Sequence, residues 1–197
     1  ETDVEQKGSL VTPDRLRFDF AHFQPMTAEE IAEVEKLVNE KIQEALPVTT
    51  QVMDIEEAKK SGAMALFDEK YSEKVRVVSM GDFSRELCGG THVANTSAIT
   101  AFKLVSESGI AAGVRRIEAL TGNGVFKYYK EVEKELHEAA KAAKCDPAQL
   151  VKRIEGLHEE IKTLTAENNQ LKNKMAKDAM GDVMNQVKDV NGCLLYT

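Results

Sequence analysis

The chain has 197 residues, 42% of them apolar, which is enough for one medium-sized domain with a core and an appendage. Its formal net charge of −7 excludes a broadly basic nucleic-acid-binding surface, so any RNA contact has to be local. The three cysteines are odd in number and far apart, which excludes a disulfide framework and fits a reducing cytoplasm. No segment approaches the roughly 18–20 consecutive apolar residues of a membrane span.

The first part of the chain predicts strands around one long helix. Thr27 and Glu30 form a capping-box pattern ahead of an apolar repeat with helical spacing, and Pro47 ends the run, so we expect a helix over residues 28–45. Residues 16–20 alternate apolar and polar side chains, which is the period of a half-buried strand. Other segments predict a short helix at 55–61 and strands at 48–55, 75–78, 99–105 and 114–120. The fold class is therefore α+β, with an antiparallel-type sheet and a long packed helix.

Residues 86–96, which read ELCGGTHVANT, hold the clearest candidate for chemistry. Cys88 and His92 are four residues apart, and the two glycines between them favour a tight loop over a helix, because each glycine costs about 1 kcal/mol in a helix interior. A thiol and an imidazole that converge from a short loop suit a zinc ion. They also suit a Cys–His nucleophilic pair. The third interpretation is a free cysteine in a glycine-rich turn beside an unrelated histidine.

Local basic residues are the candidates for RNA contacts. They are Lys7, Arg15, Arg17, Arg115 and Arg116. The alternative interpretation of each residue, taken singly, is an ordinary charged side chain exposed to solvent.

Beyond Val125 the apolar residues follow a coiled-coil pattern. After a first helix over 125–144, Asp146 is placed as an N-cap and Pro147 at the first helical position of a second helix. Its apolar seam then advances in alternating steps of four and three: Leu150, Ile154, Leu157, Ile161, Leu164, Asn168, Leu171 and Met175. Asn168 at an a position specifies the register at some cost in stability, and β-branched residues at a with Leu at d favour a two-stranded coiled coil. The seam pairs either with the first helix, as an antiparallel hairpin, or with a second chain.

The last residues predict a β-hairpin with Asn191-Gly192 as its turn, between strands at 187–190 and 193–196. We therefore expect an α+β domain over 1–122, a helical hairpin or coiled coil over 123–180, and the start of a further domain over 181–197.

Several segments, in this order, resemble the editing domain of the class II alanyl-tRNA synthetases. The segments are QKGSLV at 6–11, RLRFDF at 15–20, RVVSMGDFS at 76–84, ELCGGTH at 86–92 and SESGIAAGVRRIEA at 106–119. The similarity runs through nearly the whole chain. Within it, ELCGGTH is similar to the second zinc half-motif of that domain. The family's first half-motif, His-x-x-x-His, does not occur in the printed sequence.

The resemblance implies a zinc ion and names its site residues. Cys88 and His92 would be two of four zinc ligands, so the chain would be a fragment that lacks the N-terminal part of the editing domain. Together with these two, Gln6 is implied as a catalytic-pocket residue. Residues implied in binding the substrate or the tRNA are Lys7, Ser9, Thr91, Arg115 and Arg116.

The implied activity is hydrolysis of mischarged Ser-tRNA(Ala) and Gly-tRNA(Ala), impaired in a chain with half of the zinc ligands. The implied partner is the acceptor end of tRNA(Ala), in the cytoplasm, with a homo-oligomer formed through the coiled coil. ATP and Mg²⁺ would serve only the ligase core of the parent enzyme, which no segment of this chain matches. The alternatives are a free-standing editing hydrolase and a non-enzymatic coiled-coil scaffold.

Overall fold

The computed structural model describes residues 4–64, 72–185 and 188–195 of the chain. The chain divides into two compact units, Glu1–Lys130 and Glu131–Thr197, and each is described by itself. No helix among the described residues is long and apolar enough to cross a membrane.

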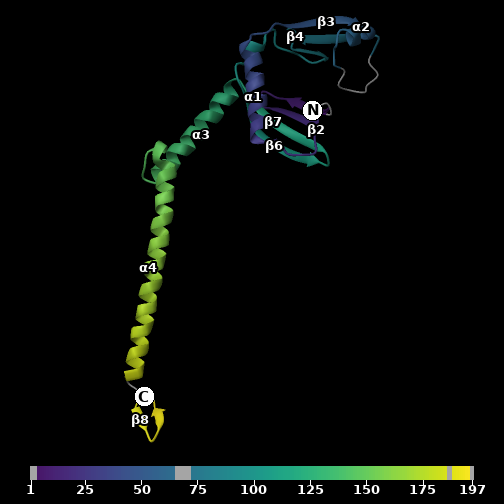
Figure 1. Ribbon diagram of the computed structural model, residues 1–197. Coiled ribbons are helices and arrows are strands. Elements are labelled where there is room, and N and C mark those ends of the chain that lie inside the picture. Colours follow the sequence, from purple (N-terminus) through teal and green to yellow (C-terminus); the bar gives the residue numbers. More distant parts are fainter. Residues whose placement is uncertain (1–3, 65–71, 186–187, 196–197) are drawn as a thin grey trace. The chain divides into compact units, whose positions relative to one another are not determined.

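The first unit holds two antiparallel sheets (Figure 1). The four-stranded sheet has the order β1-β2-β7-β6, and the three-stranded sheet has the order β3-β4-β5. Their strands are β1 (Gln6–Val11), β2 (Leu16–Ala21), β3 (Val48–Asp54), β4 (Lys74–Met80), β5 (Ser84–Leu87), β6 (Phe102–Ala111) and β7 (Val114–Thr121). The α+β class expected from the sequence is confirmed, with two sheets in place of one.

The strand expected at 99–105 begins later and runs further than predicted. A short 3₁₀ turn, η1 (Thr96–Ile99), comes first, because the Asn95 side chain accepts a hydrogen bond from the Ser97 amide and caps it. Thr100 then has a positive φ of 71°, so the backbone is not extended at this residue. Strand β6 therefore begins only at Phe102.

A small core holds the three-stranded sheet against α2 (Ile55–Lys60). Ala58, Val75, Val77 and Leu87 are buried there, and Met53 packs against them. Because side chains alternate along a strand, these residues define one face of the sheet. The residues between them, which include Arg76 and Glu86, lie on the opposite face of the sheet.

Helix α1 (Ala28–Gln43) runs along the four-stranded sheet (Figure 1). The predicted capping box is present, with the Thr27 amide donating to the Glu30 carboxylate and the Glu30 amide to the Thr27 hydroxyl. Farther along the helix, Asn39 bonds both backbone groups of Phe102 at 2.9 and 3.0 Å. The helix ends at Gln43, slightly before the predicted end at 45, and Ala45 takes a positive φ of 52°.

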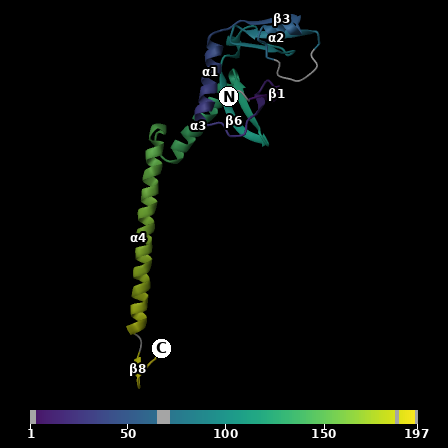
Figure 2. The same cartoon turned by 45° about the vertical axis from the view of Figure 1, so that its right-hand side comes forward.

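The second unit is built on the long helix α4 (Leu150–Asn185), which follows the 3₁₀ turn η2 (Pro147–Gln149) and the end of α3 (Asn123–Ala142). Asp146 is the N-cap residue and Pro147 lies in the first turn, as expected. Figure 2 shows α4 as one continuous helix. Most of its seam is exposed, with Ile161, Leu164 and Leu171 each at least 55% accessible, while Leu150 and Leu157 are half-buried. The hairpin and coiled-coil pairings therefore stay predictions.

The terminal hairpin is confirmed for the residues that the structure describes. It consists of β8 (Lys188–Val190) and β9 (Cys193–Leu195). Asn191 and Gly192 both have positive φ values, 56° and 80°, as a type I′ turn requires. The outermost predicted residues, 187 and 196, lie outside the described residues.

Thr96 joins the end of α1 to the segment that follows the Cys88–His92 loop. Its side chain is buried, with 3% of the residue accessible. The hydroxyl donates to the Lys41 carbonyl at 2.7 Å and accepts from the Leu46 amide at 2.9 Å. This one group therefore satisfies two backbone atoms where the helix ends.

We expect Thr96→Val to lower the free energy of unfolding by about 1–3 kcal/mol, because it leaves two backbone groups without a partner at nearly constant volume. Chemical denaturation measures the change. Thr91→Val, in the exposed part of the loop, is the control and should be nearly neutral. Equal stability of the two variants would contradict the joining role of Thr96.

Candidate metal centre

Strand β5 places Glu86 and Cys88 on the same face of the three-stranded sheet. Glu86 lies opposite Val78 of β4. The Cys88 amide donates to the Arg76 carbonyl at 3.1 Å, so the backbone pairing continues past the last residue of β5. Leu87 between them is buried in the core against α2. The two side chains therefore share the face that α2 does not cover.

The Arg76 guanidinium fixes the loop that follows β5. It donates to the carbonyl oxygens of Cys88 at 2.8 Å and Gly90 at 2.5 Å. It also reaches the Thr50 hydroxyl of β3 at 3.4 Å. These contacts join β3, β4 and the loop after β5, so the loop backbone is held against β4 by charge-assisted hydrogen bonds.

His92 is oriented by the same carbonyl. Its Nδ1 lies 3.1 Å from the Gly90 oxygen. A carbonyl can only accept, so this bond requires the proton on Nδ1 and leaves the Nε2 lone pair available in the neutral ring. Histidines that bind metals usually hold their other nitrogen in this way.

Gly90 lies beside both the thiol and the imidazole, so that a side chain there would be in van der Waals contact with each of them. A Cβ at this position would lie 3.5 Å from the Cys88 sulfur and 3.7 Å from Cε1 of His92. At Gly89 a Cβ would meet nothing within 4 Å. The two glycines of the predicted tight loop therefore differ, because only Gly90 lies next to the thiol and the imidazole.

The far end of the loop is attached to the end of α1. The Asn95 amide group donates to the Ala45 carbonyl at 2.7 Å, and the Val48 amide donates to the Ala94 carbonyl at 3.0 Å. With Arg76 at the other end, both ends of the segment 88–95 are fixed. Function carried by a loop on a rigid scaffold is the usual arrangement.

The structure brings together three potential metal donors. One donor atom each of Glu86, Cys88 and His92 lies within 4.8 Å of the other two, and all three residues are half-buried. The sequence predicted Cys88 and His92 and missed Glu86. The spacing of two residues between Glu86 and Cys88 is visible in the sequence, but it places both side chains on one face only if residues 84–87 form a strand, which the sequence analysis did not predict. Thiolate, imidazole and carboxylate are the donors that zinc takes in proteins, so the residues present fit that ion.

The other predicted pocket residues lie apart from these donors or at the loop surface. Thr91 is in the loop and exposed. Gln6, Lys7 and Ser9 belong to β1, in the four-stranded sheet, where Gln6 is half-buried and Ser9 exposed. No hydrogen bond between described residues joins β1 to the loop.

Arg115 and Arg116, predicted as tRNA contacts, bind carboxylates of their own sheet. Arg116 donates to both oxygens of Asp19 at 2.7 and 2.8 Å, and Arg115 makes a two-bond contact with Glu107. The Arg116 guanidinium holds the pKa of Asp19 below its usual range, and Arg115 does the same for the pKa of Glu107. These guanidinium groups stabilise the sheet in the described structure.

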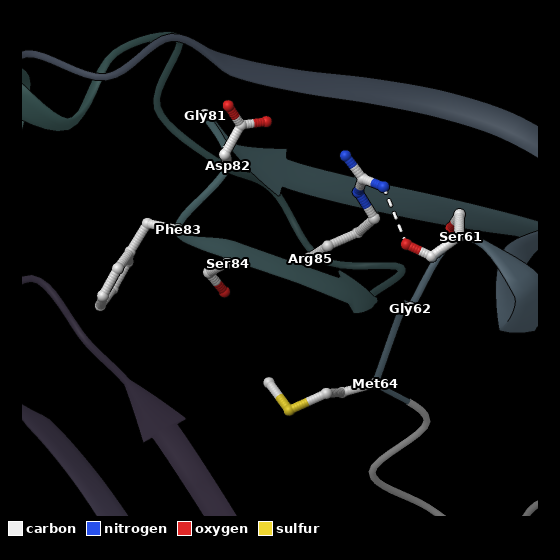
Figure 3. Close-up of a pocket in the computed structure, with 8 residues that line it drawn as sticks. All are labelled: Ser61, Gly62, Met64, Gly81, Asp82, Phe83, Ser84 and Arg85. Atoms are coloured by element: carbon white, nitrogen blue, oxygen red, sulfur yellow. Dashed lines mark hydrogen bonds between the residues drawn. The ribbon is translucent and has the colours of Figure 1, made fainter.

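A separate hollow of about 400 Å³ lies at the β4–β5 turn and the end of α2 (Figure 3). Arg85 crosses it and donates to the Ser61 carbonyl at 2.8 Å. Met64, Asp82, Phe83 and Ser84 are among its lining residues. None of the three potential metal donors lines it, so the hollow and the donor cluster are distinct features.

Residues 75–118 match the family model described as the threonyl and alanyl tRNA synthetase second additional domain. The match contains Arg76 and all three donors. Over 98% of its length the chain is 67% identical to "alanine–tRNA ligase 1" of Lachnoclostridium phytofermentans. It is 53% identical to the alanine–tRNA ligases of Acetivibrio thermocellus, over 98% of the chain, and Enterococcus faecalis, over 96%. The chain spans 22% of the length of each relative.

The Asp19–Arg116 pair predicts an acid-sensitive stability. Because the pKa of Asp19 is lowered on folding, its contribution is present above the unfolded value of about 3.9 and is lost as pH falls through the folded value. We expect Asp19→Asn to be less stable than the parent chain at pH 7 and to lose less stability between pH 5 and 3.

Denaturation at a series of pH values measures this difference. The control is Asp82→Asn, at an exposed turn, which should follow the parent curve. An Asp19→Asn curve parallel to the parent curve would show that the pair contributes nothing to acid unfolding.

Proposed function

We propose that this chain, which belongs to the alanyl-tRNA synthetase family, carries the hydrolytic editing activity of such an enzyme. The substrate is the ester between serine or glycine and the 3′ end of tRNA(Ala). The observation that carries the proposal is the cluster of Glu86, Cys88 and His92 inside the matched second additional domain.

The physical need for such an activity follows from the substrates. A site built to accept alanine cannot strongly exclude glycine, which is smaller, or serine, which adds one hydroxyl. Shape alone discriminates such pairs by about 10²-fold, so a second, hydrolytic site is required. A hydrolytic site that hydrogen-bonds the serine hydroxyl spares alanine, because alanine would leave buried polar groups unpaired at a cost of about 1–3 kcal/mol.

In this proposal Cys88 and His92 hold a zinc ion. A bound zinc supplies Lewis acidity or an activated water and orients the ester. Arg76 fixes both ligands through the loop backbone, and the Gly90 carbonyl keeps the His92 proton on Nδ1. Gln6, Ser9 and Thr91 are proposed to contact the aminoacyl end.

For the tRNA backbone we propose Lys7, Arg115 and Arg116. Lys7 is the strongest of these candidates, because its side chain is 45% accessible, against 14% for Arg115 and 29% for Arg116. Its ion pair with Glu5, at 2.8 Å, is on the surface, where such pairs contribute little and exchange readily.

The editing proposal predicts that zinc content and Ser-tRNA(Ala) hydrolysis are lost together. Cys88→Ala should abolish both, because it removes the thiolate. Gly90→Ala should reduce both, since its methyl group would contact the Cys88 sulfur and the His92 ring and leave less room for an ion beside them, whereas Gly89→Ala should have little effect.

The measurements are metal analysis and deacylation of purified Ser-tRNA(Ala). They are made on this chain and on a version extended upstream by the His-x-x-x-His segment of the family, which should show the higher activity. An extended protein that binds no zinc and leaves the ester intact would refute the editing assignment.

We also propose that the partner of α4 is a second copy of this chain. The exposed seam favours it, with Asn168 among Leu and Ile at a and d positions. A buried pair of Asn residues fixes the register of a dimer but weakens it.

Asn168→Ile should therefore tighten the dimer by about 10-fold or more, since it buries an apolar side chain in place of an amide. The neighbouring Asn169→Ile lies off the seam and should change the association far less. Analytical ultracentrifugation measures both. A parent chain and an Asn168→Ile variant that are both monomeric at high concentration would count against the dimer.

A further inference from the structure

We propose that one face of the four-stranded sheet binds phosphate groups of an RNA backbone through the guanidinium groups of Arg15 and Arg17. The inference rests on the proposed function, since the RNA is the tRNA part of the editing substrate. It goes beyond that function by assigning the surface that holds the tRNA. In the sequence the two arginines are single candidates, and the structure joins them in one charged network.

The pairing of β2, β7 and β6 defines this face. Because side chains alternate along each strand, directly paired residues point to the same side of the sheet. One side carries only polar members of these pairs, here called the polar face: Arg17 and Asp19 of β2, Arg116 and Glu118 of β7, and Ser106 and Ser108 of β6. The buried apolar residues of the same strands, Phe20, Leu104 and Ala119, lie on the other face. The core of the domain is therefore on that other side, and the two serines of the polar face are exposed.

The polar face carries more positive than negative charge. Arg116 donates to both oxygens of Asp19, and Arg15, just before β2, pairs with Glu118 at 3.2 Å. Both carboxylates are thus occupied by other arginines, and Arg17 is the third guanidinium group beside them. Three cations against two anions leave one positive charge in excess, although the net charge of the chain is −7. This is the kind of local cation cluster that RNA binding by an acidic chain requires.

Arg17 is the member of this network with the weakest contact. Its ion pair with Asp19 is long, with 3.8 Å between Nε and Oδ2, which is beyond hydrogen-bond distance. Among the described residues, this buried Nε has no hydrogen-bond partner. The side chain as a whole is still 35% accessible. Rotation of Arg17 toward an anion on the polar face would therefore break no hydrogen bond of Nε and would give this nitrogen a partner.

A phosphate group of an RNA strand is the anion that fits this arrangement. Guanidinium groups bind phosphate through two parallel hydrogen bonds. Two residues apart in an extended chain, Arg15 and Arg17 are separated by about 6–7 Å, so each is placed to bind a different phosphate of one strand. The polar face has no aromatic side chain on which a base could stack. It is therefore suited to the backbone and not to the bases.

The test is binding of purified tRNA(Ala) to the 197-residue chain, measured by fluorescence anisotropy at a series of salt concentrations. Arg17→Gln should raise the dissociation constant by about 5- to 10-fold at low salt. It should also lower the salt dependence, the slope of log K against log salt, by about 1, because one phosphate contact is lost. The control is Lys36→Gln on α1, which removes the same charge from a side chain that is 76% accessible and should keep the parent slope.

Ser108→Lys tests the same face by a gain of affinity. It adds a cation at an exposed position opposite Arg116, so it should tighten tRNA binding and raise the slope by about 1. Thr49→Lys adds the same charge at an exposed position of β3, in the other sheet, and should bind as the parent chain does. Circular dichroism verifies that each variant is folded.

Three results would overturn the inference. The parent chain could bind no tRNA at low salt, or Arg17→Gln and Ser108→Lys could both bind it as their controls do. Polyglutamate could also bind the parent chain more tightly than tRNA and lose affinity in Arg17→Gln, which would assign the polar face to an acidic protein segment. The editing proposal is decided separately, by hydrolysis of Ser-tRNA(Ala) with the extended protein. An extended protein that hydrolyses the ester while Arg17→Gln leaves tRNA binding unchanged would refute the assignment of the polar face alone.

Discussion

The hydrogen bonds of the Arg76 guanidinium are the constraint on which the candidate site depends. Glycines at 89 and 90 give the loop backbone freedom, and nothing in their own chemistry selects one conformation. Arg76 selects one loop conformation, because its guanidinium group donates to two carbonyl groups of the loop at once. One of these carbonyls also sets the proton position on His92. A single side chain of β4 thus determines where the thiol lies and which nitrogen of the imidazole is free.

The other end of the loop connects this site to the rest of the first unit. Thr96 and Asn95 bind the backbone at the end of α1, while Asn39 and Glu35 of the same helix bind the edge strand β6. Helix α1 is therefore connected by hydrogen bonds both to the loop segment and to the four-stranded sheet. This explains how β1, which carries Gln6, and the donor loop can belong to different sheets and still form parts of one compact unit.

Local sequence signals predicted most of the fold, and the misses have physical causes. The capping box of α1, the Asp146-Pro147 start and the Asn191-Gly192 turn each depend on a few neighbouring residues, and all three were found. Strand β5 was missed because four residues with three polar side chains carry no periodic signal, and its position follows from pairing with β4. Glu86 was missed for the same reason, since its nearness to Cys88 follows from that strand. The ion pairs of Arg115 and Arg116 link residues across strands, up to 97 positions apart, which no local pattern reveals.

The distribution of charge bears on how the proposed editing function could select its substrate. With a net charge of −7, and with Arg115 and Arg116 bound to carboxylates, the attraction of this chain for tRNA has to come from a few local cations such as Lys7. In the relatives the remaining length, nearly four fifths of the protein, is available for that task. Under the proposed editing function, the donor loop then needs to distinguish only the aminoacyl ester. A backbone fixed at both ends of the loop, an oriented imidazole and a positioned thiol are suited to that task, because discrimination of one hydroxyl depends on atoms held in place before the substrate arrives.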